Sequence, residues 1–114
     1  MAIDDKQYLQ LADAALQRVL RAFDDVSSDD ADLDVSGDVI SVRFRNGTRA
    51  VLNMQAPARQ LWLAGGSRAW HFDYDAVARR WVDAKGSGAE LFATLAGLAR
   101  EDAGLELRFA GDMA

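Results

Sequence analysis

The strongest local signal in this sequence is Asn46-Gly47, which separates two stretches of alternating apolar and polar residues. Alternation with period two indicates a strand with one buried face, and Asn-Gly favours the tight turn of an antiparallel hairpin. Residues 39–45 and 49–55 are therefore predicted to form a hairpin. Short alternating stretches follow at close spacing, which predicts that the same antiparallel sheet continues. They are residues 60–64, 69–74 and 80–83.

Helical periodicity flanks this predicted sheet on both sides. Apolar residues recur at helical spacing from residue 4 to about residue 24, which predicts an amphipathic helix. A second helix is predicted after Ser87-Gly88-Ala89-Glu90, which matches a capping box, with Gly104 as its C-terminal stop. Residues 105–109 alternate again, and we expect either a short last strand or an extended tail that packs beneath the helices.

The order of these segments predicts a two-layer α+β sandwich. Each terminal helix has one apolar stripe to bury, so we expect both helices to cover one face of an antiparallel sheet of five to seven strands. The chain has 114 residues, which suits one domain with a single core, and we expect residues 1–114 to form that domain.

The residue types that are rare or absent exclude several kinds of chemistry. There is no cysteine and only one histidine, His71, which excludes disulfides, thiolate sites and multi-histidine zinc or copper sites. The net charge of −5 gives no basis for binding a phosphate backbone, and no apolar run reaches the roughly 20 residues of a membrane span. The amino terminus lacks the features of a signal peptide. We therefore expect a cytoplasmic protein that binds neither nucleic acid nor membrane, with hard cations or basic protein surfaces as its ligands.

The densest charge lies between residues 24 and 34, where six aspartates occur without a basic residue. Asp24 and Asp25 are near the C-terminal end of the first predicted helix, where the helix dipole disfavours acids. Such violations of a local rule are more frequent at functional sites, because a bound cation or a basic partner relieves the repulsion. The alternative is that the acids keep the protein soluble and protect an edge strand from pairing with other chains. The six are Asp24, Asp25, Asp29, Asp30, Asp32 and Asp34.

The spacing Asp30-x-Asp32-x-Asp34 is similar to that of a calcium loop, but the rest of the loop is missing. Val35 stands where that loop needs glycine and Ser41 where it needs glutamate, so we reject an EF-hand. We expect Val35 to point inward from an edge strand while Asp32 and Asp34 point outward. Carboxylates spread along a surface, without a loop to close a cage, predict weak binding of more than one cation.

A second candidate site lies on the sheet face that the helices leave open. If the leucines beside them face the core, Gln60 and Trp62 face outward, and the same alternation turns Asn53 and Gln55 outward. His71 is expected to join them from the next strand. An outward tryptophan bordered by amides is typical of a protein-binding surface. The alternatives are a tryptophan packed under a loop and a histidine satisfied within the sheet.

One stretch resembles the signature of the frataxin family: Asn53-x-Gln55-x-Pro57-x-x-Gln60-x-Trp62-Leu63-Ala64, followed by His71-Phe72. The resemblance covers nearly the whole chain, and the short amino terminus is similar to that of the bacterial CyaY branch. It implies a frataxin-like sandwich and weak binding of ferrous or ferric iron on an acidic ridge of the first helix and first strand. It also implies interaction with the cysteine desulfurase and the scaffold protein of iron-sulfur cluster assembly. We expect a monomer in the absence of iron.

The resemblance also assigns roles to residues by position. As iron ligands it implies Asp5, Asp24, Asp25, Asp29, Asp30, Asp32 and Asp34. As partner-binding residues we expect Asp24, Asp25, Asn53, Gln55, Pro57, Gln60, Trp62 and His71. The helix departs from the family pattern, since Leu20 and Arg21 replace adjacent glutamates of many relatives and Leu9 replaces a histidine of some. We therefore expect iron binding to depend on residues 24–34.

Three functions remain open at this point. The first is an iron donor or regulator for the desulfurase and scaffold complex, without a tightly bound prosthetic group. The second is a ferroxidase, although the di-iron Glu-x-x-His helix pair is missing from the sequence. The third is a protein-binding module whose metal binding is incidental. We expect no catalytic residues for nucleophilic chemistry, because the single histidine has no evident serine partner in the sequence.

Overall fold

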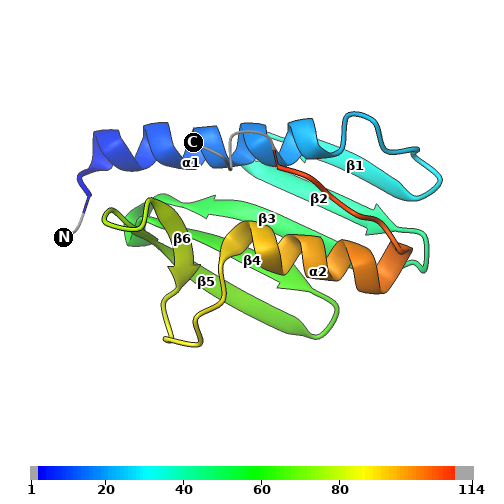
Figure 1. The fold of residues 1–114 in the computed structure, drawn as a ribbon. Coiled ribbons are helices and arrows are strands. Elements are labelled where there is room, and N and C mark those ends of the chain that lie inside the picture. Colours follow the sequence, from blue (N-terminus) through cyan, green and yellow to red (C-terminus); the bar gives the residue numbers. More distant parts are fainter. Residues whose placement is uncertain (1–2, 110–114) are drawn as a thin grey trace.

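A computed structural model describes residues 3–109 (Figure 1). One helix precedes six strands, a second helix follows them, and the chain then continues as an extended tail. The elements are α1 (Asp5–Ala22), β1 (Ala31–Ser36), β2 (Val39–Phe44), β3 (Arg49–Gln55), the 3-10 turn η1 (Ala56–Ala58), β4 (Gln60–Gly65), β5 (Arg68–Asp75), β6 (Arg80–Asp83) and α2 (Leu91–Ala103). Within residues 3–109 no helix is long and apolar enough to cross a membrane.

The six strands form one antiparallel sheet in sequence order, from β1 at one edge to β6 at the other. The predicted hairpin is confirmed as β2 and β3, joined by residues 45–48. Gly47 adopts a φ of 89° there, a conformation that favours glycine. The register places Trp62 of β4 opposite Asn53 of β3 on one side and opposite His71 of β5 on the other.

Both helices pack on the same face of the sheet and share one core with it, and in Figure 1 α1 runs along the top while α2 crosses in front of the strands. The predicted two-layer α+β sandwich is therefore confirmed. The Tyr8 hydroxyl donates a hydrogen bond of 2.8 Å to the backbone oxygen of Gln60, which ties α1 to β4. Burial raises the pKa of Tyr8, which favours the protonated hydroxyl that donates this bond. Gly65 lets α2 approach closely, since a Cβ there would lie 2.6 Å from Cδ1 of Leu98.

The second helix begins at Leu91, directly after the predicted capping segment, but its cap is not the predicted one. Its N-cap is Glu90, whose carboxylate accepts hydrogen bonds from the backbone N–H groups of Phe92 and Ala93 at 3.0 and 2.9 Å. The capping box that starts at Ser87 is therefore wrong. The reason is that Glu90 has extended backbone and forms a bridge with Val82, which holds this segment against the edge of the sheet.

The end of the second helix agrees with the prediction. Gly104 is the C-cap, with a left-handed φ of 65°. Of the two alternatives for residues 105–109, the structure has the extended tail and no strand. The Phe109 ring lies 4.8 Å from the Phe92 ring, which anchors the tail against α2.

Val35 points inward from β1 as predicted, since the register places it opposite the buried Ile40, but the helices cover only part of its side chain. Val35 is 50% exposed, whereas its cross-strand partner Ile40 is buried. Because β1 is an edge strand, Val35 has a neighbouring strand on one side only. Half of its surface therefore remains in solvent.

Candidate functional site

The acidic segment, which we define as residues 24–34, connects the end of α1 to the edge strand β1. The helix ends at Ala22 with Phe23 as its C-cap, so Asp24 and Asp25 lie in the following turn and are exposed. Asp32 and Asp34 are exposed on β1, and the prediction that they point outward from an edge strand is confirmed. The structure thus gathers six aspartates along one border of the molecule.

Two aspartates of the acidic segment already have basic partners. Asp30 forms an ion pair with Arg45 on the turn after β2. Asp32 lies 3.9 Å from its cross-strand neighbour Arg43, with both side chains more than half exposed. Within residues 3–109 the other four aspartates make no ion pair, and Arg21 does not pair with either acid of the turn. The segment therefore carries most of its uncompensated charge on Asp24, Asp25, Asp29 and Asp34.

The acidic segment does not form a closed metal cage. Among the described residues, no group of three or more histidine, cysteine, aspartate or glutamate side chains is placed to hold a metal ion. A strand rises about 3.3 Å per residue, so Asp34 lies about 13 Å along the chain from Asp30. Single carboxylates with water as the remaining ligands, rather than a shared cage, are what this geometry offers a cation.

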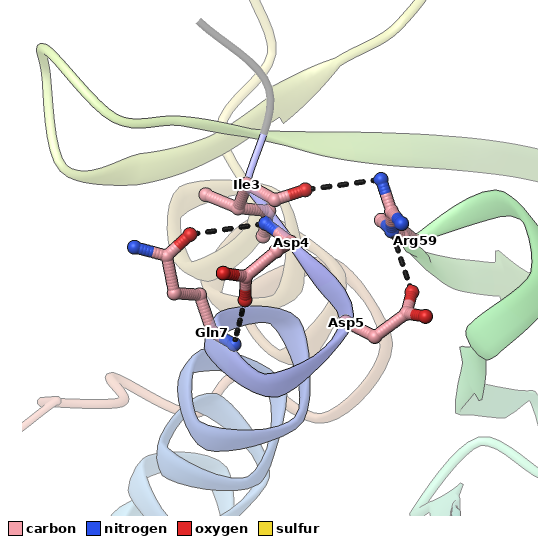
Figure 2. A network of polar contacts seen from close by, with 5 residues as sticks. All are labelled: Ile3, Asp4, Asp5, Gln7 and Arg59. Atoms are coloured by element: carbon pink, nitrogen blue, oxygen red, sulfur yellow. Dashed lines mark hydrogen bonds and ion pairs between the residues drawn. The ribbon is translucent and has the colours of Figure 1, made fainter.

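Asp5 lies far from the other predicted iron ligands. Helix α1 has 18 residues, which places Asp5 roughly 27 Å from the acidic segment at a rise of about 1.5 Å per residue. Its carboxylate accepts a hydrogen bond of 2.7 Å from Nε of Arg59, and Nη1 of Arg59 donates to the backbone oxygen of Ile3 at 3.1 Å (Figure 2). Asp5 therefore fastens the start of α1 to the end of η1.

Arg59 is a residue of this region that the sequence did not identify. It is the C-cap of η1 and adopts a left-handed φ of 52°, which is uncommon for a residue other than glycine. Together with Tyr8, Leu9 and Pro57 it lines an open pocket of about 650 Å³ between α1 and η1. Pro57, predicted to bind a partner, is exposed in η1 and faces this pocket beside α1.

The open sheet face carries an ordered group of aromatic and amide side chains. The rings of Trp62 and His71 are stacked, with centroids 4.1 Å apart and planes at 8°. Nε1 of Trp62 donates to Oε1 of Gln60 at 2.8 Å, and Nε2 of Gln60 donates to Oδ1 of Asp73 at 3.0 Å. Trp62 therefore packs against His71 of β5 and is held in place by its hydrogen bond to Gln60. Asp73 also belongs to this group of contacts, although the sequence did not predict it.

The two remaining amides complete this surface. Asn53 is the cross-strand partner of Trp62, and Gln55 is that of Gln60, so the five predicted residues adjoin across β3, β4 and β5. All five are half-buried. We call Asn53, Gln55, Gln60, Trp62 and His71 the amide-aromatic face. It lies on the side of the sheet opposite the helices.

Comparison with known proteins identifies relatives along nearly the whole chain. The frataxin-like domain family matches residues 1–105. The iron-sulfur cluster assembly protein CyaY of Azotobacter vinelandii is 42% identical over 109 residues, which cover 96% of this chain and 97% of that protein. The protein of the same name from Pseudomonas aeruginosa is 41% identical, with coverage of 96% and 99%.

Solved structures agree with these sequence matches. Frataxin from Psychromonas ingrahamii superposes with a TM-score of 0.82 at 29% identity and covers 95% of this chain and 99% of its own. Trimeric yeast frataxin, complexed with ferrous iron, has a TM-score of 0.69 and covers 92% and 90% of the two chains. Because the yeast protein is only 24% identical to this chain, its match supports a shared fold and nothing further. The matched domain, the identity over nearly the full length and the shared fold establish that this chain belongs to the frataxin-like family, among its bacterial CyaY members.

Proposed function

We propose that this protein binds iron for iron-sulfur cluster assembly and acts as an iron donor or regulator of a cysteine desulfurase and its scaffold protein. The observation that carries the proposal is the acidic segment, where four exposed aspartates have no basic partner among the described residues. The names of the relatives from Azotobacter vinelandii and Pseudomonas aeruginosa support the pathway.

The chemistry of the acidic segment suits a cargo of iron that must be released again. Aspartate oxygens are hard ligands that accept ferrous or ferric iron. Because the carboxylates are exposed and spread out, each bound ion keeps much of its water, and its attraction to them is screened by solvent. Binding is then weak and reversible, which suits delivery to an acceptor more than storage.

The two surfaces suit two different partners. Asp24 and Asp25 present negative charge that complements a basic groove on the desulfurase. The amide-aromatic face offers a tryptophan whose ring is already held by stacking on His71 and by the hydrogen bond to Gln60. Little side-chain freedom is lost when such a surface docks, so we assign it to the scaffold protein.

The proposal is tested by titrating the metal-free protein with ferrous iron under anaerobic conditions and following the backbone NMR signals. We expect broadening or shifts confined to residues 24–34 and the end of α1 that faces them. Asp24→Asn combined with Asp25→Asn should weaken this response. The matched control is Glu101→Gln with Glu106→Gln, which removes two negative charges from α2 and the tail.

Two results of this titration would contradict the proposal. Signal changes centred on His71 would place the metal outside the acidic segment. If both double variants weakened the iron response equally, net charge alone would explain the binding. Oxygen consumption by the protein with ferrous iron provides a separate measurement. A saturable rate that the aspartate variants abolish would favour a ferroxidase over a donor or regulator.

A further inference from the structure

The outer side of the sheet carries two arginines that neither iron binding nor the amide-aromatic face uses. Arg43 of β2 and Arg49 of β3 are direct cross-strand partners. Their chain neighbours Val42, Phe44 and Ala50 are buried under the helices. Since side chains alternate along a strand, both arginines leave the sheet on the open side, and both are exposed.

Folding gains little from this arrangement. Like charges directly opposite each other in an antiparallel pair are destabilising. Arg43 has one acid near it, Asp32 at 3.9 Å, and that contact is solvent-exposed and correspondingly weak. In the part of the chain that the structure describes, the Arg49 guanidinium makes no hydrogen bond or ion pair. Two positive charges thus lie side by side on an otherwise acidic protein without sufficient counter-charge from the chain itself.

The arginine pair lies on the same open surface as the amide-aromatic face. Arg49 precedes Asn53 by four residues on β3, which is about 13 Å along a strand. Between them Val51 is aligned with Ala64 of β4, and Ala64 is aligned with Ala69 of β5. These side chains are small, so the surface between the arginines and Trp62 offers no bulky obstacle to a docked chain.

We propose that Arg43 and Arg49 are a second contact point on this surface, which binds an acidic stretch of the protein that docks on the amide-aromatic face. The inference rests on the proposed function, because it extends the surface assigned to the scaffold protein. A guanidinium group binds a carboxylate through two parallel hydrogen bonds, and two adjacent groups bind an aspartate- or glutamate-containing segment. The partner carries this acid about 13 Å, or four extended residues, from the group that contacts Trp62.

The charges at the two ends of the surface also set the direction of docking. Asp73 is hydrogen-bonded to Gln60 at the far end of the amide-aromatic face from the arginines. A partner placed in the reverse direction would carry its acid away from the arginines and past the Asp73 carboxylate, and like charges close together disfavour that complex. The arginine pair and Asp73 together select one orientation.

The experiment measures scaffold binding by calorimetry at low and high salt, with the scaffold protein of the same organism as the probe. Arg43→Gln with Arg49→Gln should weaken binding about tenfold at low salt and reduce its salt dependence. The control is Lys6→Gln with Arg79→Gln, which removes the same charge from exposed positions on α1 and on the turn between β5 and β6 and should leave binding unchanged. The thermal midpoint of the Arg43 and Arg49 variant should be equal to that of the wild type or higher, since a like-charge pair is removed.

Each other outcome has a definite meaning. If the wild type binds and the Arg43 and Arg49 variant binds equally well, this inference is wrong and the proposed function stands. If the wild type does not bind, the proposed function of the face fails and the inference with it. A lower thermal midpoint without weaker binding would assign the arginines a structural role. Competition by millimolar inorganic phosphate, with shifts confined to the signals of Arg43 and Arg49, would identify a small-anion site instead.

Discussion

The acidic segment and the amide-aromatic face are both polar surfaces, but they are built in opposite ways. In the acidic segment most carboxylates are exposed and have few contacts with one another or with the rest of the chain. On the amide-aromatic face Trp62, His71, Gln60 and Asp73 are linked by stacking and hydrogen bonds. The first surface keeps its ligand atoms in water, whereas the second keeps its groups in fixed positions.

This difference indicates what each surface can bind. An ion accepts many arrangements of oxygen ligands, so mobile carboxylates bind it without a fixed geometry, at the expense of affinity. A protein partner needs complementary shape, and groups that are already ordered lose less entropy on binding. Variants that act on one surface and leave the other intact therefore test the comparison directly.

Trp62→Ala is expected to distinguish the two surfaces most strongly. A central, ordered tryptophan is typical of binding hot spots, whose loss costs about 2 kcal/mol, or roughly 30-fold in affinity. Scaffold binding measured by calorimetry should fall by this factor, while the ferrous iron titration stays unchanged. Val77→Ala is the control, because Val77 is 90% exposed on the turn between β5 and β6. Loss of iron binding in the Trp62 variant would show that the two surfaces are not independent.

Asp24→Asn combined with Asp25→Asn is expected to have the opposite effect, weakening iron binding and leaving scaffold binding intact. Ferrous iron affinity should fall about tenfold, since two of the four unpaired carboxylates are removed. Scaffold binding should not change. Unfolding in denaturant should show a gain of a few tenths of a kcal/mol, because acids close to a helix C-terminus are unfavourable. Lower stability in this variant would mean that the aspartates support the fold.

A smaller effect is expected from Gln60→Ala, which leaves Trp62 in place and removes its hydrogen-bond acceptor. One hydrogen bond contributes about 1 kcal/mol, so scaffold binding should weaken roughly fivefold. Iron binding should be unaffected. Affinity equal to that of the wild type would show that the stack on His71 alone fixes the tryptophan.

The smallest effect concerns a charge pair outside both surfaces. Arg100 donates two hydrogen bonds of 3.0 Å to Glu106, and these lower the pKa of Glu106 below its ordinary value. A carboxyl with a lowered pKa stabilises the folded state above its unfolded-state pKa, and this contribution disappears as the pH falls through the folded-state pKa. Glu106→Gln should therefore lower the thermal midpoint slightly at neutral pH and not at all in strong acid. A midpoint that differs equally at both pH values would exclude the charge pair as the cause.

Local patterns in the sequence predicted most of the fold. The change from helical spacing to alternation placed the helices and strands, and the alternation itself predicted the outward side of Trp62 and Asn53. Local patterns failed where a distant contact decides the structure. Glu90 caps α2 because the edge of the sheet holds that segment extended, and Ser87 alone could not indicate this.

The sequence predicted which residues of the two candidate surfaces face outward, but not the contacts that these residues make. Asp5 and Arg59 are 54 residues apart in the sequence, and their ion pair depends on how α1 docks beside η1. The pairing of Asp30 with Arg45 likewise depends on the register of β1 and β2. The sequence alone offered no reason to distinguish the six aspartates of the acidic segment. In the structure two of them, Asp30 and Asp32, lie beside arginines and the other four do not.

The sheet in strict sequence order has a consequence for how the chain reaches this structure. Each strand joins its sequence neighbour through a connection of two to four residues, so no strand waits for a remote partner. Short loops close quickly, and a topology rich in local pairings favours rapid folding. During synthesis all six strands have been made once Asp83 is reached, before the residues of α2 follow. A nascent chain of this kind spends little time with unpaired strand edges, which are the species that aggregate.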